Sequence, residues 1–472
     1  MSVRALGKQS LIYGFGHIIS RLITFLLLPI YTNVFTRGEY GVVSLVYAFI
    51  GFAMMFYRYG TDTALMKFYS QEKADQPVYL TTILLLQIVT GFLFSGFLIL
   101  SRSWLSPILF AVSDTTIIVI TSGILFCDTI WTLAAIVLRS EEKPVRFVLL
   151  NLINVMGSLG LNIYFVVGLH LGIRGVLYSN LIVSAFLVIL TLPFFFRRMV
   201  FHRLSPDYSR TVLRFALPFL PAGIFTMIME LSNRYFLNWL TDTATVGVYS
   251  AGYKLGMFGL LIVMGFNMGW TPYFLKQRTN PEAQKLFARV ANFFTGIQGL
   301  ISVIIILWIQ DLVTFRFLGY SFFGESFWES TVIVPIILLG YMFFGLYVLQ
   351  HPAIYHTDNT RWVVQFRAVG AVTAIVLNLA LIPLFGIMGS AWASCMAYAF
   401  MAGSIYRKTH ALYPIPYRWT AILFPVLAII LTMILPHNLF TKLALPMLYA
   451  VIWVTVILPA SDRKVLRGII SR

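Results

Sequence analysis

The chain has 472 residues, of which 59% are hydrophobic and 11% are charged, and its formal net charge is +17. Soluble domains carry about 25% charged residues, so this composition excludes an ordinary soluble protein. The two cysteines, Cys127 and Cys395, lie inside apolar segments, and this pattern predicts neither a disulfide framework nor a metal site.

The hydrophobic residues occur in blocks of about 20, each long enough to cross the roughly 30 Å hydrocarbon core of a bilayer. They predict an all-α polytopic membrane protein with about fourteen transmembrane helices. The first block, Leu11 to Tyr31, is long enough to remain as a span rather than be removed as a signal peptide. In chain order the predicted spans are 9–32, 38–60, 78–101, 116–138, 147–169, 175–196, 212–237, 246–269, 290–309, 330–350, 362–383, 386–406, 419–436 and 443–459.

The positive charges indicate the orientation of these spans. With the N-terminus inside, the cytoplasmic segments hold 25 Lys and Arg residues and the outer loops hold 5. Basic residues in short loops favour the cytoplasm, so both ends of the chain are predicted to be cytoplasmic. The excess positive charge is therefore explained by the orientation of the spans and faces anionic membrane lipids. Nothing in it supports nucleic-acid binding.

Two long stretches of the chain resemble each other at a nearly constant offset. Asn162 and Gly172 match Asn378 and Gly386, at offsets of 216 and 214. The other matching pairs are Arg146 with Arg361, Gly41 with Gly247, Gly60 with Gly269, and Lys67 with Lys276. The repeat unit contains about six spans, and an even number gives both copies the same orientation, as in the parallel repeats of secondary transporters.

The duplication predicts three parts of the chain. Residues 1–197 form an N-terminal six-helix lobe, and residues 198–408 form a C-terminal six-helix lobe. Residues 409–472 add two transmembrane helices and a basic cytoplasmic tail. In transporters with parallel repeats, the substrate site lies between the halves near the midplane.

Two motifs resemble a known family. They are the opening Gly14-Phe-Gly … Pro29-Ile-Tyr-Thr-Asn … Arg37-Gly-Glu-Tyr-Gly-Val-Val-Ser, and the segment from Asn378 through Pro383-Leu-Phe-Gly-Ile-Met-Gly to Ser394. Both are similar to prokaryotic polysaccharide exporters, which are flippases of lipid-linked oligosaccharides in the multidrug/oligosaccharidyl-lipid/polysaccharide exporter superfamily. The motifs are mainly structural, so they indicate the family better than the substrate.

This resemblance implies a fold and a function. It implies two six-helix lobes that form a V around a central cavity in the prokaryotic cytoplasmic (inner) membrane. It also implies alternating access and transfer of a polyprenyl-diphosphate-linked oligosaccharide to the outer leaflet. Other polysaccharide assembly proteins are the partners that it suggests.

Basic residues inside the predicted spans are the candidates for binding this substrate, because an ionisable group in a bilayer costs about 2.5 kcal/mol or more. Arg21 lies near the midplane of the first span, where its guanidinium would suit a diphosphate. A structural ion pair with Asp128 or Glu230 is the alternative. Lys254 is interpreted either as a second phosphate or glycan contact or as a lysine that reaches outward to the interface.

Three further basic residues complete the predicted substrate-binding set: Arg234, Arg367 and Arg58. Arg367 lies about five residues inside its span, so it either contacts the substrate or reaches the cytoplasmic headgroups. Arg58 lies at the inner end of the second span and is counted among the 25 cytoplasmic residues. It either helps to load the diphosphate or is an ordinary interfacial arginine.

Three acids are candidates for coupling or gating: Glu230, Asp128 and Asp62. Glu230 and Arg234 are four residues apart and share a helical face. Either they neutralise each other, or Glu230 takes up H⁺ or Na⁺ and releases Arg234. Such a coupling ion is the only cofactor expected.

Two other functions compete with the flippase. A cation-coupled multidrug exporter of the same fold would place acids in the core, whereas the spans here hold four basic and two acidic residues. A membrane enzyme would need catalytic groups on a sizeable outer loop. Loop 310–329 carries Asp311, Glu325 and Glu329 without a recognisable catalytic spacing, so the protein is predicted not to be an enzyme.

Overall fold

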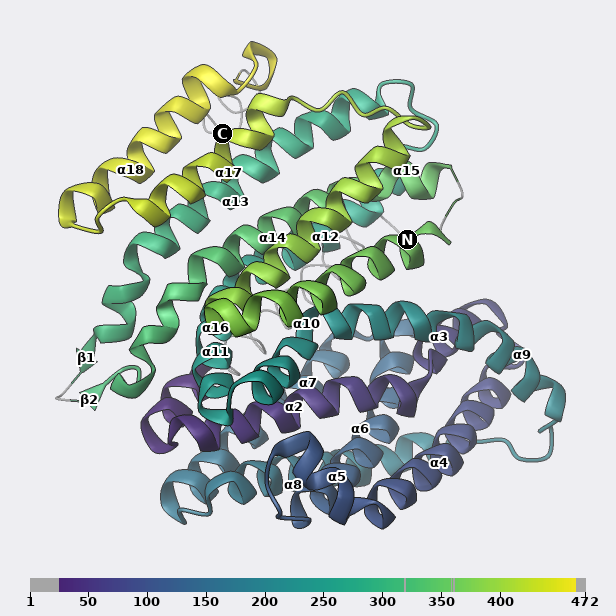
Figure 1. Ribbon diagram of the computed structural model, residues 1–472. Coiled ribbons are helices and arrows are strands. Elements are labelled where there is room, and N and C mark those ends of the chain that lie inside the picture. The colour runs from purple at the N-terminus through teal and green to yellow at the C-terminus, as the bar shows by residue number, and fades with distance from the viewer. Residues whose placement is uncertain (1–24, 318–319, 358, 360, 464–472) are drawn as a thin grey trace. The chain divides into compact units, whose positions relative to one another are not determined.

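The computed structural model describes residues 25–317, 320–357, 359 and 361–463. Arg21 lies outside the described residues. The described chain is helical, apart from one short antiparallel ladder between β1 (Arg316–Phe317) and β2 (Tyr320–Ser321) (Figure 1). The chain divides into two compact units, Met1–Ser250 and Ala251–Arg472.

The described part of the first unit begins with a helical segment, Phe25–Val34. Its further helices are α2 (Arg37–Arg58), α3 (Thr61–Gln71), α4 (Gln76–Leu100), α5 (Arg102–Phe110), α6 (Thr116–Ser140), α7 (Pro144–Asn162), η1 (Ile163–Gly168), α8 (Gly172–Phe196), α9 (Pro206–Ala216), η2 (Leu217–Phe219), α10 (Leu220–Leu240) and the first part of α11 (Thr243–Gly256). Thr36 starts α2 through a capping box with Glu39. Left-handed backbone at Tyr59 and Gly60 ends α2 and starts α3.

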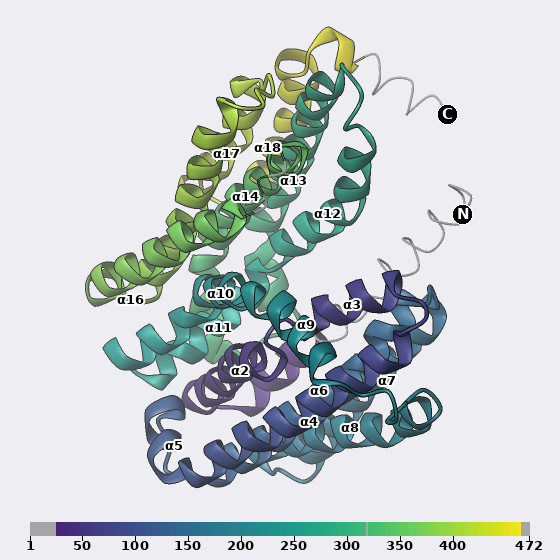
Figure 2. The same cartoon turned by 90° about the vertical axis from the view of Figure 1, so that its right-hand side faces the viewer.

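The second unit follows from the end of α11. It contains α12 (Phe258–Lys276), α13 (Ala283–Thr314), η3 (Glu325–Ile333), α14 (Val334–Leu349), α15 (His351–His356), α16 (Trp362–His410), α17 (Trp419–Ile434), α18 (Leu439–Ile452) and η4 (Trp453–Ile457). The C-terminal helices α17 and α18 both pack against α13 (Figure 2).

Eleven helical segments in the described part of the chain are long and apolar enough to cross a membrane. The protein is therefore a multi-pass membrane protein with large apolar side chains on its surface. Three short helices, α3, α5 and α15, lie outside the predicted spans, because none of them contains a block of about 20 apolar residues. The number of fourteen spans, their orientation and the three-part division stay predictions.

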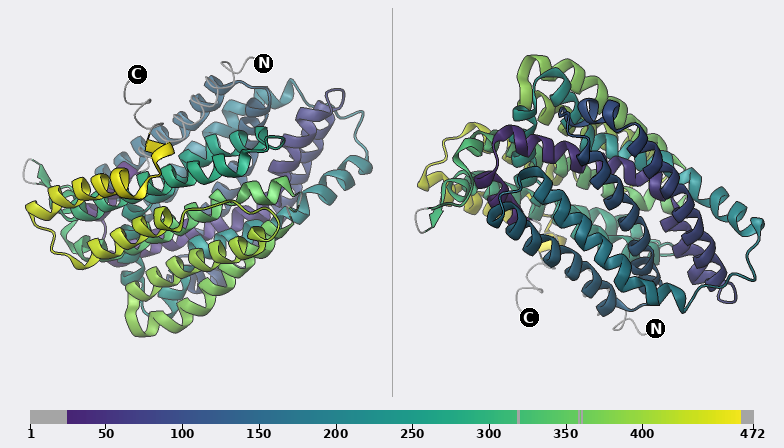
Figure 3. Two further views of the ribbon diagram at one scale, coloured as in Figure 1. Left: turned by 90° about the horizontal axis from the view of Figure 1, so that it is seen from above. Right: turned by 90° about the horizontal axis from the view of Figure 1, so that it is seen from below.

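The long helix α16 covers two predicted spans, 362–383 and 386–406. Gly386 separates its halves with a φ of 54° and a ψ of −128°, a conformation that a side chain would strain. The chain reverses direction there, and the two halves, in yellow-green, run side by side (Figure 3). In the first unit, Gly172 at the start of α8 also has a positive φ, 59°.

Two glycines allow α2 and α11 to cross in direct backbone contact. A Cβ atom on Gly41 would clash with the carbonyl oxygen of Thr243, and one on Gly247 would clash with the carbonyl oxygen of Arg37. The relation is reciprocal, because the same Cβ positions also lie 3.2 Å and 3.1 Å from the backbone nitrogens of Gly247 and Gly41. Only glycine at both positions permits this approach.

Candidate functional site

Asp128 lies in the middle of α6 and is the only acidic residue of this largely apolar helix. Its Oδ1 atom accepts hydrogen bonds from Ser184 Oγ on α8 at 2.6 Å and from Trp131 Nε1 at 2.8 Å. Two neutral donors therefore hold the carboxyl group in one orientation. A carboxylate in such a place is costly unless a cation, a proton or several donors compensate its charge.

A chain of hydrogen bonds joins Arg58 to the same part of α6. Arg58 Nη1 lies 3.0 Å from Asp62 Oδ2, and its Nη2 donates to Thr132 Oγ1 at 2.9 Å. Thr132 Oγ1 in turn donates to the backbone carbonyl oxygen of Asp128 at 2.6 Å. The turn at Gly60 makes this possible, since it places Asp62 in the first turn of α3. The structure thus brings together Arg58, Asp62 and Asp128, three of the residues that the sequence singled out.

Polar side chains of other spans form further pairs in the first unit. Tyr31 donates from its hydroxyl to Asn162 Oδ1 at 2.8 Å, and the Asn180 amide donates to the Tyr47 hydroxyl at 2.7 Å. The sequence analysis did not single out this set as functional. The available signal was an asparagine inside an apolar block, since a buried amide also requires partners.

Glu230 and Arg234 lie one turn apart on α10, as their spacing predicted. Arg234 is 7% exposed, and its Nη1 donates to the backbone carbonyl oxygen of Glu230 at 2.9 Å. Neighbouring residues anchor α10: Asn233 donates to the Tyr249 hydroxyl on α11 at 2.6 Å, and the Tyr235 hydroxyl donates to the Leu45 carbonyl oxygen on α2 at 3.1 Å. Arg234 is therefore a buried cation on a firmly positioned membrane helix.

The remaining two predicted cations belong to the second unit. Lys254 is half-buried in the last turn of α11. Arg367, on the first half of α16, is electrostatically coupled to Tyr347 of α14 and His351 of α15. Tyr347 is 1% exposed, and its ring packs edge-on against His351 with 5.0 Å between the ring centroids. Arg367 thus belongs to a cluster that contains a tyrosine and a histidine.

Glu141, just beyond the end of α6, connects three elements. It accepts from the Tyr69 hydroxyl of α3 at 2.8 Å and from Lys143 Nζ at 2.6 Å, and it lies 3.4 Å from Arg198, just after α8. Burial raises the pKa of the carboxyl group, but these hydrogen bonds and the charges of Arg198 and Lys143 outweigh it and hold the pKa below its ordinary value. We interpret this cluster as a structural tie.

The sequence model of the family described as polysaccharide biosynthesis protein matches residues 6–277. The chain belongs to this polysaccharide biosynthesis protein family. The family agrees with the resemblance seen in the opening motif. A sequence comparison with curated proteins finds no match.

Solved structures show which fold this family member shares. The lipid II flippase MurJ, in an inward closed conformation, is 13% identical, with a TM-score of 0.74 over 95% of this chain and 98% of that chain. The MATE transporter VcmN from Vibrio cholerae is 12% identical, with a TM-score of 0.60 over 86% of this chain and 96% of that one. A MOP superfamily transporter from Pyrococcus furiosus is 13% identical, with a TM-score of 0.62 over 86% and 95%.

These structures place the polysaccharide biosynthesis protein described here in a fold shared by flippases and exporters. At 12–13% sequence identity, the likeness to these structures shows a shared fold and nothing about the substrate. Among the described residues, no group of three or more His, Cys, Asp or Glu side chains is arranged to hold a metal ion.

Proposed function

We propose that the protein moves a polyprenyl-diphosphate-linked oligosaccharide from the cytoplasmic to the outer leaflet by alternating access. The observation that carries this proposal is the fold of a lipid II flippase over 95% of the chain, in a member of a polysaccharide biosynthesis family. The protein would act in a prokaryotic cytoplasmic membrane beside other polysaccharide assembly proteins.

The diphosphate is the part of this substrate that needs charged partners inside the membrane. Among the described candidates we assign this role first to Arg234, because it is a buried guanidinium on a membrane helix. A guanidinium presents two parallel N–H donors to phosphate oxygens. Arg21 is also proposed to bind the diphosphate, because the sequence predicts that it lies near the midplane of the first span. Lys254 and Arg367 are proposed as further substrate contacts.

For coupling we propose Asp128 as the group that binds H⁺ or Na⁺. Binding of either cation would cancel the charge of the carboxylate and so change its interaction with Arg58, whose field reaches it. Thr132 provides a direct link, since it contacts both the Arg58 guanidinium and the backbone of residue 128. Glu230 and Asp62 are the secondary coupling candidates.

We expect Asp128→Asn to remove the dependence of transport on the coupling ion and to slow transport about tenfold, a typical size for such coupling. Asparagine keeps the size of the side chain and still accepts from Ser184 and Trp131. The measurement is flipping in proteoliposomes with imposed H⁺ or Na⁺ gradients. The matched control is Asp114→Asn, because Asp114 precedes α6 and pairs with Arg174 in the first turn of α8. An unchanged gradient dependence in Asp128→Asn would contradict the assignment.

Depletion of the protein in its native cell tests the function itself. We expect a polyprenyl-diphosphate glycan to accumulate on the cytoplasmic leaflet, where labelling of intact and opened vesicles can locate it and mass spectrometry can identify it. Re-expression of the wild-type chain should reverse the accumulation. If no such lipid accumulates, the flippase proposal is wrong.

A cation-coupled multidrug exporter is the second candidate, favoured by the shared fold with MATE transporters and by an acid, Asp128, inside the first unit. It predicts export of a cationic dye from proteoliposomes that requires Asp128 or Glu230. The flippase proposal predicts instead that the dye is retained while the lipid-linked glycan is moved.

A further inference from the structure

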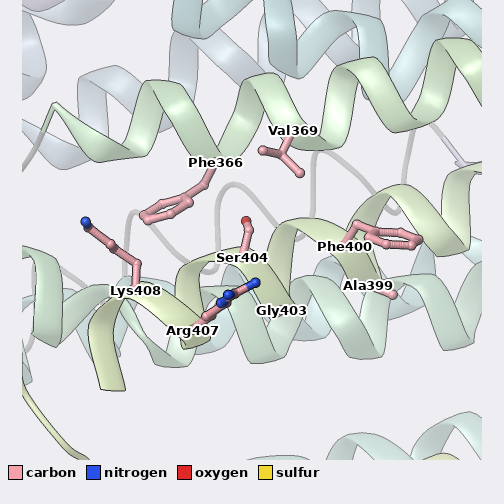
Figure 4. A pocket seen from close by; sticks show the side chains of 8 residues that line it. All are labelled: Phe366, Val369, Ala399, Phe400, Gly403, Ser404, Arg407 and Lys408. Carbon is pink, nitrogen blue, oxygen red and sulfur yellow. The ribbon is translucent and has the colours of Figure 1, made fainter. Parts of the chain in front are cut away.

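The two halves of α16 enclose a groove of about 710 Å³. Phe366 and Val369 of the first half face Phe400 and Gly403 of the second half (Figure 4). Gly403 keeps the floor of the groove open, since a Cβ atom there would meet no other atom within 4 Å. The volume is within the usual range of small-molecule sites, roughly 300–1,000 Å³.

The groove is apolar along most of its length and cationic at one end. Arg407 and Lys408 lie at that end, and both are exposed. The Lys408 ammonium lies 5.0 Å from the ring centroid of Trp362. Within the described part of the chain, no carboxylate forms an ion pair with either cation. The groove therefore presents two charges that another molecule can neutralise.

An exposed apolar stripe continues from the groove along each half of α16. On the first half it consists of Val369, Val372, Val376 and Leu379, and on the second half of Trp392, Met396 and Phe400. Their spacing of three or four residues places each set on one face of its helix. In a membrane protein such a face lies against lipid chains.

We propose that this groove binds an anionic phospholipid of the cytoplasmic leaflet, such as phosphatidylglycerol. The phosphate would lie at Arg407 and Lys408, and one acyl chain would lie along Phe366, Val369 and Phe400. The distribution of Lys and Arg predicts that this end of α16 is cytoplasmic, and basic clusters at helix ends on that side attract anionic headgroups. This inference does not depend on the proposed transport function.

The test measures phosphatidylglycerol bound to the purified full-length protein by native mass spectrometry. Because each basic residue adds to the attraction of an anionic lipid, Arg407→Gln with Lys408→Gln should weaken binding about thirtyfold. Lys276→Gln removes one exposed charge at the end of α12 and is the matched control. Undiminished binding by the double variant would overturn the proposal.

A second variant distinguishes a seated lipid from diffuse attraction. Gly403→Leu keeps both cations but fills the open floor of the groove, so it should also reduce binding. Full binding by Gly403→Leu would show that the charges act without the groove, and would overturn the site. A polyprenyl monophosphate that binds while phosphatidylglycerol does not would overturn the choice of a phospholipid in favour of a lipid carrier.

Discussion

Replacing Arg234 with glutamine is expected to abolish transport while leaving the protein folded in the membrane. Glutamine can still donate to the carbonyl oxygen of Glu230, so the local contact of α10 is retained. What is lost is the charge, and hydrogen bonds from a charged group to phosphate contribute about 1.5 to 3 kcal/mol each. If Arg234 contacts both phosphates, losing its charge should therefore lower the rate of transport about a hundredfold or more. The measurement is flipping of the lipid-linked glycan in proteoliposomes.

Two comparisons separate substrate binding from a structural pair. Arg214→Gln makes the same chemical change at an exposed position on α9 and should transport normally. The double variant Glu230→Gln with Arg234→Gln removes both charges. If the two residues only neutralise each other, the double variant should recover transport, whereas a diphosphate ligand cannot be recovered in this way. Normal transport by Arg234→Gln alone would refute the role of this arginine.

Gly41→Ala is expected to destabilise the protein by about 3 kcal/mol, the upper end of the usual cost of overpacking. The added methyl group meets the backbone of Thr243, which cannot move aside as a flexible side chain can. Gly247→Ala should have a similar effect against the backbone of Arg37. Thermal unfolding in detergent, followed by tryptophan fluorescence, measures the change.

The matched control for the crossing is Gly96→Ala on α4, where a Cβ atom would meet nothing within 4 Å. It should be neutral or slightly stabilising, because alanine favours a helix over glycine. The double variant Gly41→Ala with Gly247→Ala should cost less than the sum of the single changes, since one separation of the helices relieves both clashes. Equal stabilities for Gly41→Ala and Gly96→Ala would contradict the backbone crossing.

Much of the helical architecture could be predicted from the sequence, because a bilayer requires long apolar blocks and these blocks are visible in the chain. The kink of α16 was also foreseeable, since the boundary between two predicted spans lies at Gly386. The short helices α3, α5 and α15 were not predicted. Each is too short to cross a bilayer, so none of them contains the long apolar block by which a span is predicted.

For the candidate site, the sequence could predict contacts only between residues about one helical turn apart. The contact between Glu230 and Arg234, four residues apart on α10, follows from helical spacing. The contact between Arg58 and Asp62 also needs the left-handed backbone at Tyr59 and Gly60, which separates α2 from α3. The bond between Asp128 and Ser184 joins residues 56 positions apart and depends on how α6 packs against α8. No pattern within either helix contains that information.

Residues that the proposed duplication aligns share local features in the structure. Gly172 and Gly386, which the repeat aligns, both have a positive φ, at 59° and 54°. Asn162 and Asn378, also aligned, are both fully buried, and each donates to the carbonyl oxygen four residues earlier, at 2.7 Å. Common ancestry of the halves stays a prediction, but the two glycines share a positive φ and the two asparagines share this hydrogen bond to their own helix.

The contact between Gly41 and Gly247 also has a consequence for rates. Where two helices meet through large side chains, a change in their crossing angle requires those side chains to exchange rotamers. At the closest point of this crossing, between Gly41 and Gly247, the nearest atoms belong to the backbone, so there are no rotamers to exchange there. A rotation of α2 against α11 about this point would therefore meet no local barrier from repacking, and its speed would be determined by contacts farther along the two helices.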